Sequence, residues 1–398
     1  MANFKDLNFK NIRALVRVDF NVPLNDAYEI TDDTRMTAAI PTIEKILADG
    51  GSVVLMSHLG RPKDGPTEKY SLKHLVAHLS HLLGGKEVIF ADDCISDEAL
   101  KMSSNLKPEQ VLLLENLRFY KEEEKGDEAF AEKLSKHGDF WVNDAFGTAH
   151  RAHASTTIVA KFFPKDKRSF GYLMETEVNN GNKVIDNPAS PVTAIVGGAK
   201  VSDKIKLLEK LIDISDNILI GGGMAYTFIK AQGGQIGKSL CENEFLDLAI
   251  TTLALAKDQN CQIHLPSDSV VADNFSADAN FKIVNSNEIE EDWMGLDIGP
   301  DATEAYSNVI KNSKTILWNG PMGVFEFENF SKGTFGVANA VADATTLGAF
   351  SLIGGGDSVA AINKAGLNDK VSFVSTGGGA MLEFLEGKVL PGIAAVTE

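Results

Sequence analysis

Short runs of apolar residues alternate with amphipathic stretches along nearly the whole chain. Many of these runs are continuously apolar, which is typical of strands in a parallel sheet whose two faces are both covered by helices. The apolar runs predict strands at residues 13–20, 51–57, 87–91, 111–116, 139–145, 191–198, 217–223, 262–268, 315–320, 350–356 and 371–379. Helical spacing with recognisable ends predicts helices at residues 34–51, 71–84 and 242–260. This order of strands and helices predicts an α/β architecture with right-handed crossovers.

The length of 398 residues exceeds what one hydrophobic core usually serves, so we expect two domains. The best candidate linker is residues 171–192, a polar stretch whose end contains Pro188 and Pro191. Before this stretch the predicted strands end in Asp, Asn, His and Arg, whereas several strands after it end in glycine triplets. This change of character indicates two domains that bind two different ligands.

The composition argues against several classes of protein. A formal net charge of −17 argues against general affinity for nucleic acid or for an anionic membrane. No apolar run approaches the ~20 residues that cross a bilayer. The first residues also lack the apolar core of a signal peptide, so we expect a cytoplasmic location. Cys94, Cys241 and Cys261 form no C-x-x-C pair, so they suggest neither a disulfide framework nor a cysteine zinc site.

Three predicted strands of the second half run through a glycine triplet into a predicted helix, at residues 221–223, 354–356 and 377–379. Glycine reaches positive φ and lets a ligand approach the backbone, and the first turn of a helix offers unpaired N–H groups to an anion. Tight packing of a strand on a helix would also explain a single triplet. Three triplets favour a nucleotide or a similar polyphosphate, although neither a Walker A loop nor a dinucleotide G-x-G-x-x-G is present.

Three charged residues stand near such glycines. Asp357 follows its triplet directly and would repel phosphates unless Mg²⁺ lay between them, although a helix N-cap is an alternative role. Lys200 and Lys204 follow the glycine pair 197–198, and their four-residue spacing would place them on one face of a helix. A grip on phosphate is one explanation of these lysines. A solvated helix is the other, and we prefer it for the later lysines of the same stretch.

Cations and polar residues gather at predicted strand and helix ends in the first half. These residues are Asp19, Asn21, Arg35, His58, Arg61, Asn116, Arg118, His150, Arg151 and His153. In one sheet these ends would lie along a single edge, where several guanidinium and imidazole groups would meet. Guanidinium binds carboxylate and phosphate in a bidentate manner, so a small polyanion is the expected ligand. A lone arginine of this kind is more often part of a surface ion pair, but four together favour a site.

Two other charged clusters have simpler explanations. His74, His78 and His81 deserve consideration as metal ligands, but no H-E-x-x-H pattern is present and a structural role is favoured. The stretch "YKEEEKGDEAF", residues 120–130, is interpreted as a solvated charged turn and the start of a helix. Neither cluster is included in the predicted site.

With these residues assembled, the chain resembles the phosphoglycerate kinase family from about Phe9 to the last residue. The motifs that carry the resemblance are "RVDFNVP", "SHLGRP", "ENLRF", "NDAFGTAHRAHAS", "GGAKVSDKI", "GGGMAYTF", "WNGPMGVFE", "GGGDS" and "STGGGA". They occur in the family's order with suitable gaps, and jointly they are very specific. The departures are slight: Ser358 stands where threonine is frequent, and Met381 stands where a small polar residue is usual.

The resemblance implies two Rossmann-like domains, each a mainly parallel sheet flanked by helices, around a central cleft. The expected limits are residues 1–171 for the N-terminal domain, 172–190 for a hinge helix and 191–385 for the C-terminal domain. Residues from about 386 to 398 are expected to return to the N-terminal domain.

The resemblance also implies two sets of site residues. The 3-phosphoglycerate site would consist of Asp19, Asn21, Arg35, His58, Leu59, Gly60, Arg61, Arg118 and Arg151. The Mg-nucleotide site would consist of Lys200, Lys204, Gly222, Asn319, Glu326, Gly355, Gly356, Asp357 and Ser358. Asp357 would hold Mg²⁺ and Glu326 would meet the ribose. The residues expected to stabilise the moving phosphoryl group are Arg35, Lys200, Lys204 and Gly378.

The activity implied is reversible phosphoryl transfer from 1,3-bisphosphoglycerate to MgADP, in line and with closure of the domains. In the direction that consumes ATP the nucleophile is a carboxylate with a pKa of roughly 4, so no general base is needed. This agrees with a sequence that offers cations and glycines rather than a catalytic base. We expect small-molecule substrates, Mg²⁺ with ATP or ADP, a monomer, and neither nucleic acid nor a membrane as a partner.

Three other functions remain open. A kinase that acts on another small carboxylate is the nearest alternative. A two-lobed solute-binding protein would normally carry an export signal and would not need two differently equipped half-sites. A nicotinamide-dependent oxidoreductase lacks its glycine fingerprint here, and titration with NAD and with ADP would distinguish it.

Overall fold

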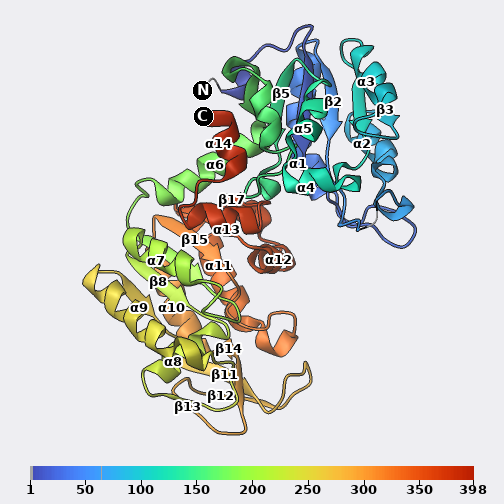
Figure 1. Cartoon of the computed structure of the whole chain (residues 1–398). Helices are drawn as coiled ribbons and strands as arrows, with labels where there is room; N and C mark the ends of the chain where they lie inside the picture. Colours follow the sequence, from blue (N-terminus) through green and yellow to red (C-terminus); the bar gives the residue numbers. More distant parts are fainter. Residues whose placement is uncertain (1–2, 64) are drawn as a thin grey trace. The chain divides into compact units, whose positions relative to one another are not determined.

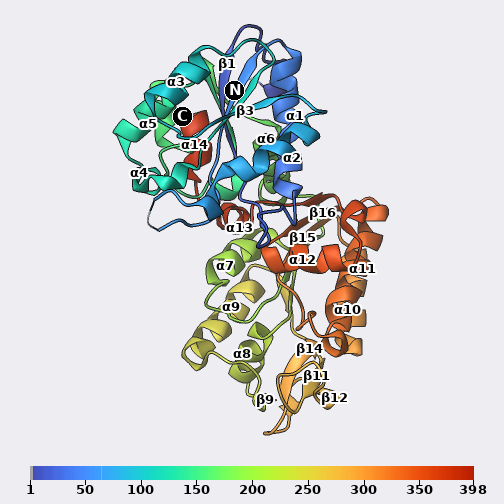
Figure 2. The ribbon, with the colours of Figure 1, turned by 90° about the vertical axis from the view of Figure 1, so that its right-hand side faces the viewer.

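The computed structural model describes residues 3–63 and 65–398. The chain divides into two compact units, and each is described by itself. The first unit consists of residues 1–179 together with 389–398, and the second unit consists of residues 180–388. Each unit is built on a six-stranded sheet (Figures 1 and 2). The expected α/β architecture with two parallel sheets is therefore confirmed.

The sheet of the first unit has the order β3-β4-β2-β1-β5-β6. Its strands are β1 (Arg13–Val18), β2 (Ser52–Met56), β3 (Val88–Ala91), β4 (Val111–Leu114), β5 (Phe140–Asp144) and β6 (Arg168–Phe170). All neighbouring pairs are parallel; in register, Val16 of β1 faces Leu55 of β2 and Val142 of β5. Because later strands are added first on one side of β1 and then on the other, the order reverses between β1 and β5. Ligands bind at such a point, beyond the carboxyl ends of the strands.

Helices cover this sheet and bury its apolar residues. They are α1 (Thr34–Ala48), α2 (Val76–Leu82), α3 (Asp97–Ser104), α4 (Lys121–Lys125) and α5 (Glu128–Ser135). In α1, Ile43 and Leu47 are one turn apart and lie in the same core cluster as Val16 and Leu55. The helix begins at Thr34, the start of the predicted range, and Asp33 is its N-cap residue.

The sheet of the second unit has the order β10-β8-β7-β15-β16-β17, and its neighbouring pairs are parallel. Its strands are β7 (Val192–Val196), β8 (Asn217–Ile220), β10 (Gln262–His264), β15 (Thr315–Asn319), β16 (Phe350–Gly354) and β17 (Phe373–Val374). Here the order reverses between β7 and β15. The flanking helices are α7 (Ile205–Ile214), α8 (Met224–Ala231), α9 (Leu246–Asp258), α10 (Pro300–Lys311), α11 (Lys332–Thr346), α12 (Gly356–Lys364) and α13 (Gly379–Leu385).

A smaller antiparallel sheet lies in the second unit and is missing from the sequence prediction. It has the order β12-β11-β14, and a two-stranded pair of β9 and β13 lies near it (Figures 1 and 2). The bounds of these strands are β9 (Gln235–Ile236), β11 (Asp268–Ala272), β12 (Phe281–Asn285), β13 (Glu288–Ile289) and β14 (Met294–Ile298). In β12 every second residue is exposed, so the strand lacks the continuous apolar run that identified the others.

Two helices connect distant parts of the chain. α6 (Tyr172–Ile185) contains the point at which the chain passes from the first unit to the second. α14 (Pro391–Thr397) belongs to the first unit (Figure 1). Asn143 Nδ2 donates to Gly392 O at 3.0 Å, and Arg168 Nη1 donates to Ala395 O at 2.8 Å. Among the described residues, none of the helices has the length and apolar character needed to span a bilayer.

Candidate functional site

The ends of β1 and β2 bring the first predicted residues together in the first unit. Asn21, just after β1, accepts a hydrogen bond at Oδ1 from the Gly60 N–H at 2.8 Å. Asp19 is nearly buried and accepts from the Asn21 N–H at 3.3 Å, while His58 lies beside it with 3% exposure. Burial, followed by the charges of Arg17, Arg118 and Arg35, lowers the pKa of His58 well below its usual value. The imidazole is therefore neutral near pH 7.

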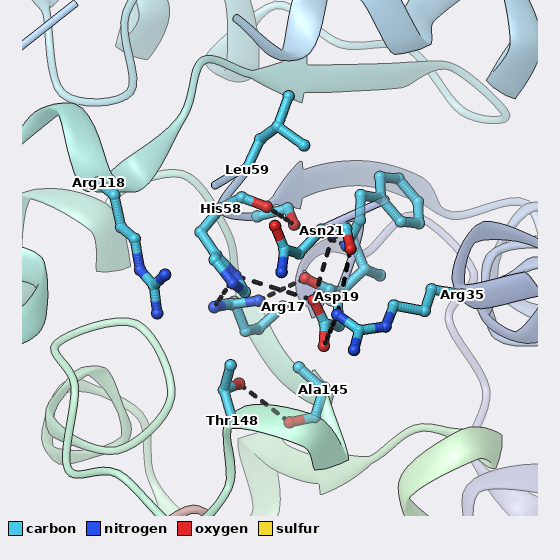
Figure 3. A network of polar contacts seen from close by, with 12 residues as sticks. Arg17, Asp19, Asn21, Arg35, His58, Leu59, Arg118, Ala145 and Thr148 are labelled. Carbon is cyan, nitrogen blue, oxygen red and sulfur yellow. Dashed lines mark hydrogen bonds and ion pairs between the residues drawn. The ribbon is translucent and has the colours of Figure 1, made fainter. Parts of the chain in front are cut away.

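Arg35, in the first turn of α1, extends to this cluster (Figure 3). Its Nη1 donates to Asp19 Oδ2 at 3.3 Å and to Asn21 O at 3.1 Å. The Arg35 side chain keeps 39% of its surface exposed, so the guanidinium combines a fixed position with access to a ligand. The structure thus joins Asp19, Asn21 and Arg35, as the sequence predicted.

The loop after β2 is held by the loop after β4. Asn116 donates from Nδ2 to Leu59 O at 2.8 Å and accepts at Oδ1 from Leu59 N–H at 3.2 Å. Arg118 Nη1 donates to Gly60 O at 2.9 Å, and burial lowers the pKa of this guanidinium. Leu59, Gly60 and Arg118 therefore lie in the same cluster as Asn21 and His58.

The two remaining predicted arginines, Arg61 and Arg151, have fewer contacts with this cluster. Arg151 donates from Nε to His150 Nε2 at 3.2 Å, and its charge contributes to the lowered pKa values of Arg118 and His153. Arg151 is therefore near the cluster. Arg61 is exposed, and its role in a site stays a prediction.

Two buried residues of this region were missed or misread in the sequence. Arg17 lies inside β1 with 0% exposure, and its guanidinium meets His58 (Figure 3). Glu123 belongs to the stretch that we interpreted as solvated, yet it is fully buried and accepts from Ser155 N–H at 3.0 Å and from Ser155 Oγ at 2.6 Å. The solvated interpretation is wrong for Glu123. A charge within an apolar strand was the signal that could have identified Arg17, because buried charges require partners.

The histidines of residues 72–82 have structural partners. His74 Nε2 lies 2.7 Å from Glu68 O, and its ring stacks on Tyr28 at 4.4 Å between ring centres. His78 Nε2 lies 2.8 Å from Asp33 Oδ2. These contacts agree with the structural role that the sequence favoured.

In the second unit, glycines allow the loops after three strands to touch through their backbones. A Cβ at Gly197 would lie 2.0 Å from Pro321 O, and one at Gly320 would lie 2.2 Å from Gly197 O. Gly222 has φ +69°, and a Cβ there would lie 2.5 Å from Gly198 O. Close approach of loop backbones therefore explains Gly222 of the first triplet, whereas the alternative left open by the sequence was packing of a strand on a helix.

The later triplets are more open. A Cβ at Gly356, Gly378 or Gly379 would meet no atom within 4 Å, whereas one at Gly355 would lie 2.9 Å from Asn319 Nδ2. As predicted, each triplet leads into a helix, because Gly223, Gly355 and Gly378 are the N-cap residues of α8, α12 and α13. The open glycines of α12 and α13 leave their first N–H groups accessible to a ligand.

Asp357 and Ser358 follow in the first turn of α12. Asp357 is exposed, and the N-cap position is occupied by Gly355 instead, so the alternative role of Asp357 as an N-cap does not hold. Ser358 is buried and accepts at Oγ from the Gly320 N–H at 2.5 Å. Ser358 thus ties α12 to the loop after β15.

The lysines are arranged differently from the prediction. Lys200 is exposed in a loop, and α7 begins only at Ile205 with Lys204 as its N-cap, so the prediction of one helical face is wrong. Lys204 Nζ nevertheless donates to Asn319 Oδ1 at the end of β15. Burial lowers the pKa of Lys204, while Asp203 and Asp357 act in the opposite direction.

A pocket of about 580 Å³ opens beside these loops within the second unit. Its lining includes Gly198, Gly222, Leu240, Met322, Val324, Glu326 and Asp357. Asp297, which the sequence analysis missed, also lines it, and burial raises the pKa of this carboxyl to about 8. Leu240, Met322 and Val324 form an apolar part of the lining. Glu326 and Asp357 add exposed carboxylates. Such a lining suits a flat heterocycle with a charged group beside it.

Known proteins are similar to this chain in sequence and in fold. A family model described as "Phosphoglycerate kinase" matches residues 4–388. The phosphoglycerate kinase of Porphyromonas gingivalis is 52% identical, over 98% of this chain and 99% of that protein. The cytosolic phosphoglycerate kinase of Triticum aestivum is 53% identical, over 99% of this chain and 97% of that protein. The solved structure of phosphoglycerate kinase from Coxiella burnetii has a TM-score of 0.90 and 43% identity, and the match covers 98% of this chain and 97% of that chain.

Proposed function

The chain belongs to the phosphoglycerate kinase family, and we propose that it transfers a phosphoryl group reversibly between 1,3-bisphosphoglycerate and MgADP. The products are 3-phosphoglycerate and MgATP, and the enzyme is a phosphotransferase whose acceptor is a carboxyl group. The observation that carries the assignment of roles to residues is the cluster of cations at the strand ends of the first unit. A kinase acting on another small carboxylate remains the second candidate.

In this proposal the first unit binds 3-phosphoglycerate. Arg35 and Arg118 supply guanidinium groups that suit carboxylate and phosphate, and neutral His58 supplies a hydrogen-bond donor. The remaining proposed binding residues are Asp19, Asn21, Leu59, Gly60, Arg61 and Arg151. Asp19 and Asn21 hold Arg35 and the Gly60 loop in place. The acceptor is ionised near pH 7, so these residues need to orient it rather than deprotonate it.

The second unit binds the nucleotide in the pocket near Gly222. The apolar lining would take the base, Glu326 would bind the ribose, and Lys200, Lys204 and the N–H groups of α12 and α13 would bind the phosphates. The other proposed binding residues are Asn319, Gly355, Gly356 and Ser358. An exposed carboxylate at the start of α12 fits Mg²⁺, which proteins bind through one or two carboxylates together with substrate phosphates. Asp357 would therefore hold the ion, which neutralises phosphate charge when bound.

The chemistry needs alignment and neutralisation of charge. We assign Arg35, Lys200, Lys204 and the backbone at Gly378 to stabilising the phosphoryl group as it moves. Because the two ligands bind to separate units, transfer in line requires the units to bring them together and to exclude water. We also propose that the protein acts in the cytoplasm, since two relatives of this sequence are named cytosolic, although one is named chloroplastic. That it acts as a monomer stays a prediction of the family resemblance.

A coupled assay tests the proposed function. ATP formation from 1,3-bisphosphoglycerate and ADP, dependent on Mg²⁺, is the expected result. Acetate and glycerate serve as alternative acceptors in the reverse direction, with ATP as the donor. Turnover of either one faster than that of 3-phosphoglycerate would favour the second candidate. Binding of NAD without binding of ADP would contradict both.

A further inference from the structure

Four buried polar side chains form a continuous chain beneath the cluster of the first unit. Glu123 Oε1 accepts from Ser155 Oγ at 2.6 Å, and the same Oγ accepts from Arg17 Nε at 2.8 Å. Arg17 Nη2 in turn lies 3.2 Å from His58 Nδ1. Glu123, Ser155 and Arg17 are 0% exposed, and His58 is 3% exposed. Of these four side chains only that of His58 has a role in the proposed substrate binding, so the other three require an explanation.

The last contact determines where the proton of His58 lies. A guanidinium has only donors, so Nδ1 of the neutral imidazole must accept from Arg17 and the proton must reside on Nε2. Asp19 competes, because its Oδ1 lies 3.8 Å from the same Nδ1 and would prefer a proton there. That distance is too long for a hydrogen bond, whereas the Arg17 contact is within range. The Nε2–H tautomer therefore prevails, and it gives His58 a donor for an anionic ligand.

Glu123 and Ser155 keep Arg17 in this position. Ser155 Oγ orients the guanidinium through Nε, and the remaining Arg17 group, Nη1, donates to Val18 O. Glu123 supplies the negative charge that a fully buried arginine needs, and it also lies 4.0 Å from His153 Nδ1. The charged and titratable groups that face this chain are Asp19, Arg35, Arg118 and His153. Without Ser155 or Glu123, the contact of Nη1 with Val18 O remains, but the contacts above no longer fix the guanidinium plane at Nε.

We propose that Glu123 and Ser155 are positioning residues, which hold Arg17 so that His58 presents an Nε2–H donor to the anionic substrate. This inference rests on the proposed function in naming 3-phosphoglycerate as that substrate. The tautomer itself is a property of the protein without ligand. A purely structural role of the buried chain would stabilise the first unit and leave the tautomer and the relative substrate affinities unchanged.

The experiment compares the wild type with Ser155→Ala, Glu123→Gln and a control, Glu122→Gln. Glu122 is exposed on the same short helix as Glu123, so the control makes the same chemical change outside the buried chain. Samples labelled with ¹⁵N in histidine report both ring nitrogens, and His58→Gln assigns the His58 signals among the 8 histidines. Steady-state kinetics give KM for 3-phosphoglycerate and for MgATP separately.

The wild type and Glu122→Gln should show His58 with a protonated Nε2 and a bare Nδ1 between pH 6.5 and 8. In Ser155→Ala the two nitrogens should move towards the averaged shifts of mixed tautomers. KM for 3-phosphoglycerate should rise about fivefold to tenfold, as expected for loss of one buried hydrogen bond. KM for MgATP should change less than twofold. Ser155→Ala keeps both buried charges, so it decides the question if Glu123→Gln does not fold.

Unchanged His58 shifts in folded Ser155→Ala, or equal rises of both KM values, would overturn the proposal. A wild type whose His58 carries its proton on Nδ1 would also overturn it. Failure of the proposed function would look different, since the wild type would then not turn over 3-phosphoglycerate while its tautomer remained as described.

Discussion

Lys204 Nζ donates a hydrogen bond to Asn319 Oδ1, which joins the residue before α7 to the last residue of β15. Asn319 also donates from Nδ2 to Gly354 O at 3.1 Å, so one amide side chain links the loops that follow β7, β15 and β16. Lys200 lies in the same loop as Lys204 but is exposed. The two lysines therefore differ in what a substitution would remove, because Lys204 supports the loops and Lys200 only extends from them.

Lys200→Ala should lower kcat by at least about a hundredfold, the scale of one lost donor to a transition-state oxyanion. The fold should be unaffected, because Lys200 is exposed. Lys206→Ala is the matched control, since Lys206 is an exposed lysine of α7, and it should keep its activity. Steady-state rates at saturating substrate, with circular dichroism as a check of folding, decide this. Near-normal turnover of Lys200→Ala would remove Lys200 from the phosphoryl-transfer step.

Gly222→Ala should raise KM for MgATP at least about tenfold. The new Cβ would lie 2.5 Å from Gly198 O, so the loops that border the pocket must separate. Gly366→Ala is the control, because Gly366 has a nearly identical φ of +67° but a Cβ there meets nothing within 4 Å. The control carries only the left-handed strain, of about 1 kcal/mol. Equal KM values for the two variants would contradict the importance of the close backbone approach.

Asp144 should make the first unit less stable as pH rises from about 4 to about 7. Burial raises the pKa of Asp144 to about 7, above the usual value near 4, so the folded state retains a proton that the unfolded state has released. The contribution of Asp144 to the free energy of unfolding is therefore largest below pH 4 and is lost as pH rises through 7. Asp144→Asn removes the ionisation. The difference in Tm between this variant and the wild type should therefore be at least about 3 °C more in favour of the variant at pH 8 than at pH 5.

The control for this comparison is Asp166→Asn, an exposed aspartate of the same unit. Its Tm should follow that of the wild type at both pH values, within the error of thermal unfolding measured by fluorescence or calorimetry. A constant difference between Asp144→Asn and the wild type from pH 5 to pH 8 would show that Asp144 does not titrate in this range.

Val396→Ala should destabilise the first unit, whereas Val389→Ala should not. Val396 in α14 is 4% exposed, and Val389 is 76% exposed. Two buried methyl-sized groups correspond to about 1.5 kcal/mol, and the exposed valine has no such burial to lose. Thermal unfolding and limited proteolysis of the two variants measure the difference. Similar behaviour of both would indicate that α14 packs only loosely on the first unit.

The parts of the site at strand ends could be predicted from the sequence. Asp19, His58 and Asn319 each follow an apolar run, and a parallel sheet necessarily collects such positions at one edge. The glycine triplets likewise predicted where α8, α12 and α13 begin. In these cases the local sequence pattern alone was sufficient to predict where the residues lie in the fold.

Other parts depend on packing between distant residues. Glu123 has the sequence surroundings of a solvated helix, and its buried partners Arg17 and Ser155 lie far from it in the chain. Lys200 and Lys204 have the spacing of one helical face, but Gly198 has φ +116° and α7 begins only at Ile205. The strand β12 pairs with β11, and its residues alternate between exposed and half-buried positions. A search for continuously apolar runs therefore does not find it.

The return of residues 389–398 to the first unit has a consequence for biosynthesis. On a translating ribosome, residues 3–179 emerge long before Val389, yet Asn143 and Arg168 need the carbonyls of Gly392 and Ala395 to complete their hydrogen bonds. The early part of the nascent polypeptide must therefore wait, with the surface that later receives α14 uncovered, while about two hundred further codons are read. The second unit has no such delay, since its residues 180–388 are contiguous.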